Sequence, residues 1–95
     1  MANKIDLHFE KIKPKNHAFL NDHEKLIYQM QVFRGFYFEA RNNREHNIKI
    51  IHGSGKGKLK EAVHNFLNEQ TCISQIRPGL LNEGGEGVTI AYFKL

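Results

Sequence analysis

Residues 50–63 read IIHGSGKGKLKEAV, and this stretch joins a predicted strand to a predicted helix. Ile50 and Ile51 end a β-branched run, and after the glycines the apolar residues recur with helical spacing. Three glycines alternate with Ser54 and Lys56 between these two patterns. Glycine costs conformational entropy on folding, so three in five residues indicate a constraint on the backbone at this point.

The start of a helix offers unpaired backbone N–H groups and a partial positive charge, which together attract anions. Lys56 and Lys58 add positive charge at the same junction. The sequence therefore predicts a phosphate site here, while a tight strand-to-helix turn without a ligand is the alternative.

Outward from this junction, the chain alternates between strand and helix patterns. Strands are predicted at 4–8, 47–51, 72–77 and 88–95, and helices from the cap Asn21 to about Asn42 and over 58–69. Residues 9–20 form a predicted irregular basic loop, and 80–87 form a glycine-rich loop. The predicted order is βαβαββ.

This order predicts an α/β fold of one domain, a two-layer sandwich. Strand–helix–strand units form parallel pairs with right-handed crossovers, so the first three strands should run parallel. The last strand returns antiparallel to them, which gives a four-stranded mixed sheet with both helices on one face.

Parallel strands place their carboxyl ends at one edge of a sheet, where ligands of open α/β sheets usually bind. Asp6 and His8 lie at the end of the first strand, and His52 follows the second. The loop with Gly84, Gly85 and Gly87 precedes the last strand. Three segments distant in sequence should therefore meet at one edge.

Charge is distributed unevenly over the 95 residues. Residues 1–60 contain twelve Lys and Arg against six Asp and Glu, a net +6, whereas residues 61–95 contain two against four, a net −2. This asymmetry suits a polyanion such as nucleic acid, and a solvated basic surface is the alternative. The single cysteine, Cys72, excludes an internal disulfide and fits a reducing compartment.

Several classes of protein are excluded by pattern. No apolar run approaches the roughly 18 residues of a membrane span, and the N-terminus has no signal-peptide pattern, so we expect a cytoplasmic protein with no membrane contact. A P-loop would need a hydroxyl residue where Leu59 stands, and the glycine spacing also departs from the dinucleotide fingerprint. Zinc is not expected, because the remaining histidines lack metal-site spacing: His17, His23, His46 and His64.

Three blocks of residues, in this order and context, resemble the small MutS-related (Smr) domain family. They are Asp6-Leu7-His8, the His-Gly-x-Gly-x-Gly block that begins at His52, and GGEGVTI at 84–90. The resemblance implies a fold like the C-terminal domain of translation initiation factor three. It also implies nucleic-acid binding and, in several family members, an endonuclease activity on DNA or RNA and an association with DNA repair.

Under this resemblance the predicted catalytic residues are Asp6, His8 and His52. Imidazole can act as acid or base near neutral pH, and a carboxylate can orient it or help to hold a divalent metal such as magnesium or manganese. The predicted phosphate-binding and nucleic-acid-binding residues are Gly53, Ser54, Gly55, Lys56, Gly57, Lys58, Gly84, Gly85 and Gly87.

Alternatives remain open from the sequence. Asp6 can instead cap a neighbouring loop, and His52 can hydrogen-bond the turn and order the glycines. The family usually has glycine where this chain has Phe9, a departure that bears on catalysis more than on binding. A noncatalytic module that recruits nucleic acid or a ribosome, or a protein-docking domain, would account for the same residues. We expect residues 1–95 to act as the C-terminal part of a larger protein with other domains.

Overall fold

The computed structural model describes residues 3–15, 17–54 and 57–94. Gly55 and Lys56, predicted to bind phosphate, lie outside the described residues. The elements, in chain order, are β1 (Lys4–Asp6), α1 (Phe9–Ile12), η1 (His17–Phe19), α2 (Asp22–Asn42), β2 (Asn47–Ile51), α3 (Lys58–Asn68), β3 (Ile73–Pro78), η2 (Leu81–Glu83), η3 (Gly85–Gly87) and β4 (Val88–Phe93).

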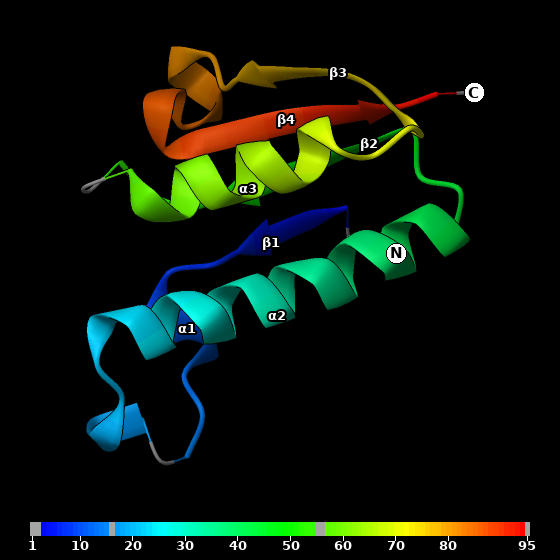
Figure 1. Cartoon of the computed structure of the whole chain (residues 1–95). Helices are drawn as coiled ribbons and strands as arrows, with labels where there is room; N and C mark the ends of the chain where they lie inside the picture. Colours follow the sequence, from blue (N-terminus) through cyan, green and yellow to red (C-terminus); the bar gives the residue numbers. More distant parts are fainter. Residues whose placement is uncertain (1–2, 16, 55–56, 95) are drawn as a thin grey trace.

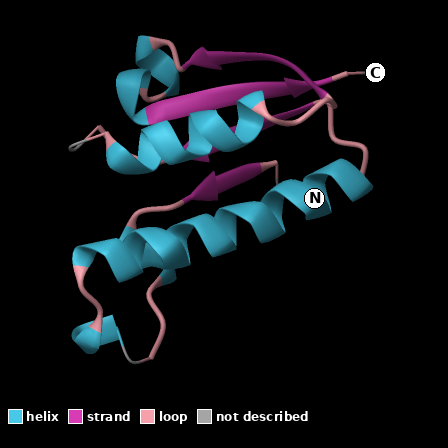
Figure 2. Cartoon of the chain, in the orientation of Figure 1, coloured by secondary structure: helices cyan, strands magenta, loops and turns pink. Residues whose placement is uncertain are grey.

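The sheet has the order β1-β2-β4-β3 (Figure 1). β1 pairs parallel with β2, and β4 pairs antiparallel with both β2 and β3. The first three strands therefore run in one direction, as predicted. α2 and α3 lie on the same face of this sheet (Figure 2). The predicted two-layer α/β sandwich is confirmed.

α2 begins as the sequence predicted. The Asn21 side chain accepts a hydrogen bond from the backbone N–H of Glu24 at 2.8 Å, and the Glu24 carboxylate accepts one from the backbone N–H of Asn21 at 3.0 Å. This reciprocal capping box satisfies two N–H groups that the first turn of a helix leaves unpaired. α2 then continues through Gly35 without interruption.

The core lies between the helices and the sheet. Phe33 and Tyr37 of α2 are fully buried, and both rings pack edge-on against Phe66 of α3, with centroids 5.4 and 5.1 Å apart. From the sheet, Ile48 and Ile50 are also fully buried. Full burial of a large apolar side chain stabilises the fold by roughly 1.5–3 kcal/mol, so these contacts fix both helices on the sheet.

The segment after β1 differs from its prediction. Residues 9–20 were expected to be irregular, but Phe9–Ile12 form a helical turn and His17–Phe19 a 3-10 turn. A single turn is too short to show helical periodicity in sequence. The Lys11 N–H donates to the His8 carbonyl at 2.8 Å, and the Phe9 ring packs edge-on against Tyr28. Tertiary contact with α2 thus accompanies a turn that the local sequence did not predict.

β1 is also shorter than predicted, because it ends at Asp6 rather than His8. The Leu7 N–H still donates to the Ile51 carbonyl at 2.8 Å, so the chain remains tied to β2 for one more residue. His8 then occupies the N-cap position of α1 without a side-chain capping hydrogen bond. Its imidazole lies next to Gly53, just after the end of β2.

Candidate nucleic-acid site at the strand ends

Two loops meet beside the end of β2. The glycine turn (residues 53–57) follows β2, and the final loop (residues 80–87) precedes β4. The backbone N–H groups of His52 and Gly53 both donate to the Gly87 carbonyl, at 3.0 and 2.9 Å. The final loop thus holds the start of the glycine turn in place.

Asp6 and His8 form a pair at the end of β1. One carboxylate oxygen of Asp6 accepts hydrogen bonds from the His8 backbone N–H at 2.9 Å and from its Nδ1 at 2.7 Å. Burial alone would raise the pKa of Asp6, but these two hydrogen bonds outweigh it, and the pKa lies below its usual value. The charged carboxylate therefore holds the proton of His8 on Nδ1 and leaves Nε2 as the acceptor.

The imidazole of His8 lies against the glycine turn. A Cβ atom at Gly53 would be 2.9 Å from His8 Nε2, and Gly53 has a φ of +81°. The His8 side chain is 48% exposed, and within the described part of the chain its Nε2 has no hydrogen-bond partner. His8, Gly53 and Ser54 line a groove of about 530 Å³ together with the final loop. An oriented imidazole with a free nitrogen thus faces this groove.

His52 has the opposite surroundings. It is 6% exposed, and its Nδ1 donates to the Gly53 carbonyl at 2.8 Å. Its Nε2 then accepts from the Thr89 hydroxyl at 2.8 Å, and that hydroxyl oxygen accepts from His64 Nε2 at 2.7 Å. Burial lowers the pKa of His52, and the neighbouring His64 and Lys60 lower it further. The contacts of His52 favour a role in bracing the turn.

The other predicted binding residues of the turn lie around α3. Ser54 is exposed in the groove, and Gly57 is the residue before the first turn of α3, with a φ of +79°. Lys58 begins α3 and is exposed. Gly57 and Lys58 line a second hollow, which shares Gly53 with the groove of His8.

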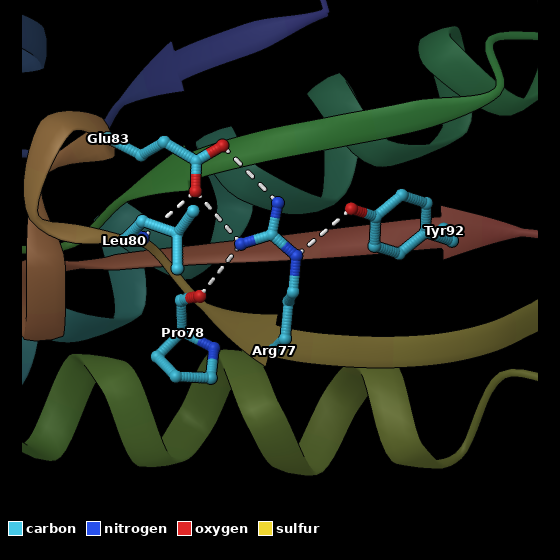
Figure 3. Close-up of polar contacts among 5 residues, drawn as sticks. All are labelled: Arg77, Pro78, Leu80, Glu83 and Tyr92. Atoms are coloured by element: carbon cyan, nitrogen blue, oxygen red, sulfur yellow. Dashed lines mark hydrogen bonds and ion pairs between the residues drawn. The ribbon is translucent and has the colours of Figure 1, made fainter.

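Gly84 and Gly85 lie in the final loop, which is braced by an ion pair (Figure 3). The guanidinium of Arg77 donates to both carboxylate oxygens of Glu83, at 2.9 and 3.3 Å, and to the Tyr92 hydroxyl at 3.0 Å. Glu83 also accepts from the backbone N–H of Leu80 at 2.9 Å. The Arg77 hydrogen bond lowers the pKa of Glu83 to about 2.

The sequence reasoning missed the residues that support the site. Arg77 and Glu83 were not selected, although a glutamate three residues after Leu80 has the spacing of a capping box. Thr89 and His64 were also missed as partners of His52. Thr89 is a polar residue that is fully buried, and the two-residue period of a strand places it on the same face as Ala91 and Phe93 of the core.

Metal ligands do not cluster in the described residues. No group of three or more His, Cys, Asp or Glu side chains is placed to hold a metal ion in residues 3–15, 17–54 and 57–94. Asp6 offers one carboxylate beside His8, but we assign no ligand set and derive no step through a metal. Among the helices of these same segments, none is both long and apolar enough to cross a membrane.

Curated relatives match half of the chain. The protein named Endonuclease MutS2 from Staphylococcus haemolyticus is 47% identical over 47 residues, which are 50% of this chain and 6% of that protein. The Endonuclease MutS2 of Halothermothrix orenii is 49% identical over 47 residues, with the same coverage. The matched segment is thus a small part of these longer proteins.

Solved structures match nearly the whole chain. The Smr domain of Thermus thermophilus MutS2 superposes with a TM-score of 0.75 at 20% identity, covering 99% of this chain and 100% of that one. YdaL, a stand-alone small MutS-related protein from Escherichia coli, gives a TM-score of 0.66 at 19% identity, covering 98% of this chain and 65% of that one. These two likenesses establish a shared fold. The family model of the Smr domain matches residues 7–94, and the chain therefore belongs to the Smr domain family.

Proposed function

We propose that this Smr domain binds nucleic acid at its strand-end groove and cleaves the phosphodiester backbone there, with His8 as the group that transfers the proton. The observation that carries this proposal is the position of His8. Its imidazole is oriented by Asp6 at 2.7 Å, and its Nε2 lies against the backbone at Gly53. A basic nitrogen that faces a groove can accept the proton of an attacking hydroxyl, which is the role of a general base in phosphodiester cleavage.

Binding would use the glycine turn and the start of α3. The first N–H groups of a helix lack partners within the helix and attract a phosphate oxygen, and Lys58 adds an exposed ammonium. The +6 net charge of residues 1–60 favours the same partner, because lysine and arginine neutralise backbone phosphates. Contacts of Gly55 and Lys56 with the phosphate stay a prediction.

The chemistry can be written with His8 as a general base. Nε2 takes the proton of an attacking hydroxyl, from water or from a ribose, as its oxygen bonds to phosphorus. The bond from phosphorus to the leaving oxygen breaks, and that oxygen takes up a proton from solvent. Asp6 stabilises the imidazolium that forms, and N–H groups of the turn stabilise the added charge on the phosphate oxygens. Proton transfer of this kind contributes about 10²–10⁴-fold in rate.

His52 would act as a positioning residue in this scheme. Both of its ring nitrogens are engaged within the fold, so it would hold the turn at Gly53 and the Gly87 carbonyl in register. The final loop would also hold the turn in place, through the hydrogen bonds that the Gly87 carbonyl accepts. The sequence predicted a catalytic role for His52 instead. Stability and cleavage measurements on His52→Ala distinguish that catalytic role from the positioning role.

The test is cleavage of a supercoiled plasmid and of a structured RNA, each with magnesium, with manganese and with a chelator. His8→Ala should lose cleavage, whereas the control His46→Ala should retain it, since His46 is an exposed histidine at the opposite end of β2. Wild-type cleavage by a folded His8→Ala variant would refute the assignment. The active substrate identifies DNA or RNA, and the chelator arm shows whether a metal is needed.

A noncatalytic recruitment module is the second candidate. This candidate is favoured by the hydrogen bonds of His52, which occupy both of its ring nitrogens. Among the described residues of the groove, His8 therefore has no second histidine beside it with a free nitrogen for acid–base chemistry. Salt-sensitive binding without cleavage would support this module, and neither binding nor cleavage would support a protein-docking domain. The relatives named MutS2 are far longer than the matched segment, which supports the prediction that the domain works beside others.

A further inference from the structure

A second hollow adjoins the groove of His8. This helix-side pocket has a volume of about 340 Å³ and is lined by residues from α1, α2 and α3 and by the buried His52, with Phe9, Leu26, Gln29 and Leu59 among the helix residues. Gly53 lines both this pocket and the groove of His8. The two hollows therefore meet at the start of the glycine turn.

Three apolar side chains form part of the pocket lining. Phe9, Leu26 and Leu59 are half-buried, so part of each apolar side chain faces the unfilled volume. The Phe9 ring is held edge-on to Tyr28, with centroids 6.3 Å apart. A volume near the lower end of the range for small-ligand pockets suits one flat ring system. An aromatic ring and two leucines offer such a group stacking and apolar contact.

The rim of the pocket is positively charged. Lys25, Lys58 and Lys60 line it, against one carboxylate from Asp22. Lys60 is paired with Glu86 at 2.9 Å, and the Lys25 ammonium lies 5.2 Å from the centroid of the Phe9 ring. Apolar walls beneath a cationic rim fit a ligand that has a flat apolar part joined to an anion, as in a nucleotide.

We propose that the helix-side pocket holds one unpaired nucleobase of the nucleic acid whose adjacent phosphate lies at the glycine turn. This inference rests on the proposed binding function and names its substrate class, namely single-stranded or locally unpaired nucleic acid. A base within a duplex would first have to unstack and unpair, which costs a few kcal/mol, whereas a single strand avoids most of that cost. Stacking of a base on an aromatic ring tolerates any sequence.

The experiment measures binding by fluorescence anisotropy with three probes of equal length. They are a single-stranded oligonucleotide, the same strand with abasic sugars throughout, and a duplex. The abasic strand keeps the phosphates and removes the bases, so the affinity ratio of the first two probes isolates the contribution of the bases. We expect the wild-type domain to bind the strand with bases about tenfold more tightly, as one stacked base provides.

Leu26→Trp should fill the pocket and remove this preference while leaving affinity for the abasic strand and the duplex unchanged. The matched control is Ile27→Trp, one residue further along α2, where the side chain is 45% exposed and lines no part of this pocket. That control should keep the preference. Phe9→Leu provides a second route, since it removes the stacking ring, and thermal melting establishes that each variant is folded.

The outcomes separate this inference from the proposed function. Equal, salt-sensitive binding of the base-containing and abasic strands by wild-type protein would overturn the nucleobase pocket and leave phosphate binding intact. A preference that survives in both Leu26→Trp and Phe9→Leu would also overturn it, because the base would then bind elsewhere. Failure of all three probes to bind would refute the proposed function and this inference together.

Discussion

The two histidines at the ends of adjacent strands have opposite surroundings. His8 is about half exposed, is held through one nitrogen by Asp6, and presents the other to a groove. His52 is buried, and both of its nitrogens are hydrogen-bonded to the fold. In sequence they are equivalent candidates for acid–base chemistry. This difference, an accessible nitrogen without a partner among the described residues on His8 and none on His52, underlies the reactive role that we propose for His8 and the bracing role that we propose for His52.

Removal of His8 should produce the largest effect. His8→Ala should lower the cleavage rate by about 10²–10⁴-fold, the usual contribution of one general acid or base. Its melting temperature should change little, because His8 is exposed and its main partner, Asp6, can bind water instead. Single-turnover cleavage and thermal melting on the same preparation measure both. A large loss of stability with unchanged cleavage would reverse the comparison between the two histidines.

His52→Ala should act mainly on stability. It removes the acceptor of the Thr89 hydroxyl proton and the side-chain donor to the Gly53 carbonyl, and it creates a buried cavity, so we expect the free energy of unfolding to fall by about 2–4 kcal/mol. His64→Ala is the matched control, because it removes the outer end of the same network and leaves the bond from Thr89 to His52. Urea denaturation should rank the loss for His52→Ala above that for His64→Ala.

The fold was predictable because its signals are local and repetitive. The apolar stripe through Met30, Phe33 and Tyr37 predicted α2, and the β-branched residues at 47–51 predicted β2 with its observed bounds. Chain connectivity then fixed the strand directions. α1 was not predictable, since its four residues show no period and its formation accompanies the contact of Phe9 with Tyr28.

The candidate site was predictable only as a set of residue types near one edge. Parallel strands placed Asp6, His8 and His52 together, but which ring nitrogen is free depends on partners distant in sequence. Thr89 is 37 residues from His52, and no local pattern links them. Sequence therefore located the site, and three-dimensional contacts were needed to divide the roles within it.

The glycine turn offers a matched pair of variants that sharpens the comparison. Gly53 and Gly57 have nearly the same positive φ, +81° and +79°, so alanine at either position should cost roughly 1–2 kcal/mol of backbone strain. At Gly53 the new Cβ atom would also lie 2.9 Å from His8 Nε2, whereas at Gly57 it would meet nothing within 4 Å.

Gly53→Ala should therefore lower both stability and cleavage, because His8 must move. Gly57→Ala should lower stability through backbone strain, without displacing His8. Melting temperatures and cleavage rates of the two variants give the comparison. Equal cleavage by both variants would show that the contact between His8 and Gly53 does not matter for activity.

The buried histidines should also give the domain a pH-dependent stability. Burial lowers the pKa of both His52 and His64 in the folded state below 6.5. The unfolded chain therefore binds more protons than the folded chain as the pH falls below 6.5, and the free energy of unfolding should decrease there. Above that value the contribution is fully present. Asp6 and Glu83, whose pKa values are lowered, stabilise the fold at neutral pH as well, and this stabilisation is lost only at more acidic pH, below the ordinary pKa of a carboxylate.

Urea denaturation at several values between pH 7 and pH 5 measures this decrease, and His52→Ala should make it shallower. An equal pH dependence in wild type and His52→Ala would mean that the buried network is not the source. His17→Ala, at a half-buried histidine outside the network, is the control.

The smallest expected effect concerns a single charge at the start of α3. Lys58 is exposed and lies next to the glycine turn, so Lys58→Ala should weaken binding of nucleic acid uniformly across sequences. Each phosphate contact contributes nearly one unit to the slope of log affinity against log salt, so the loss should flatten that slope by about one unit.

Lys94→Ala removes an exposed lysine after β4, at the opposite end of the sheet from the glycine turn, and should leave the slope unchanged. The two variants carry the same net charge, so a difference in slope between them assigns the contact to the turn rather than to overall charge. Equal slopes in both variants would show that the backbone of the nucleic acid does not approach Lys58, and the binding site would then have to lie on the His8 side of the turn alone.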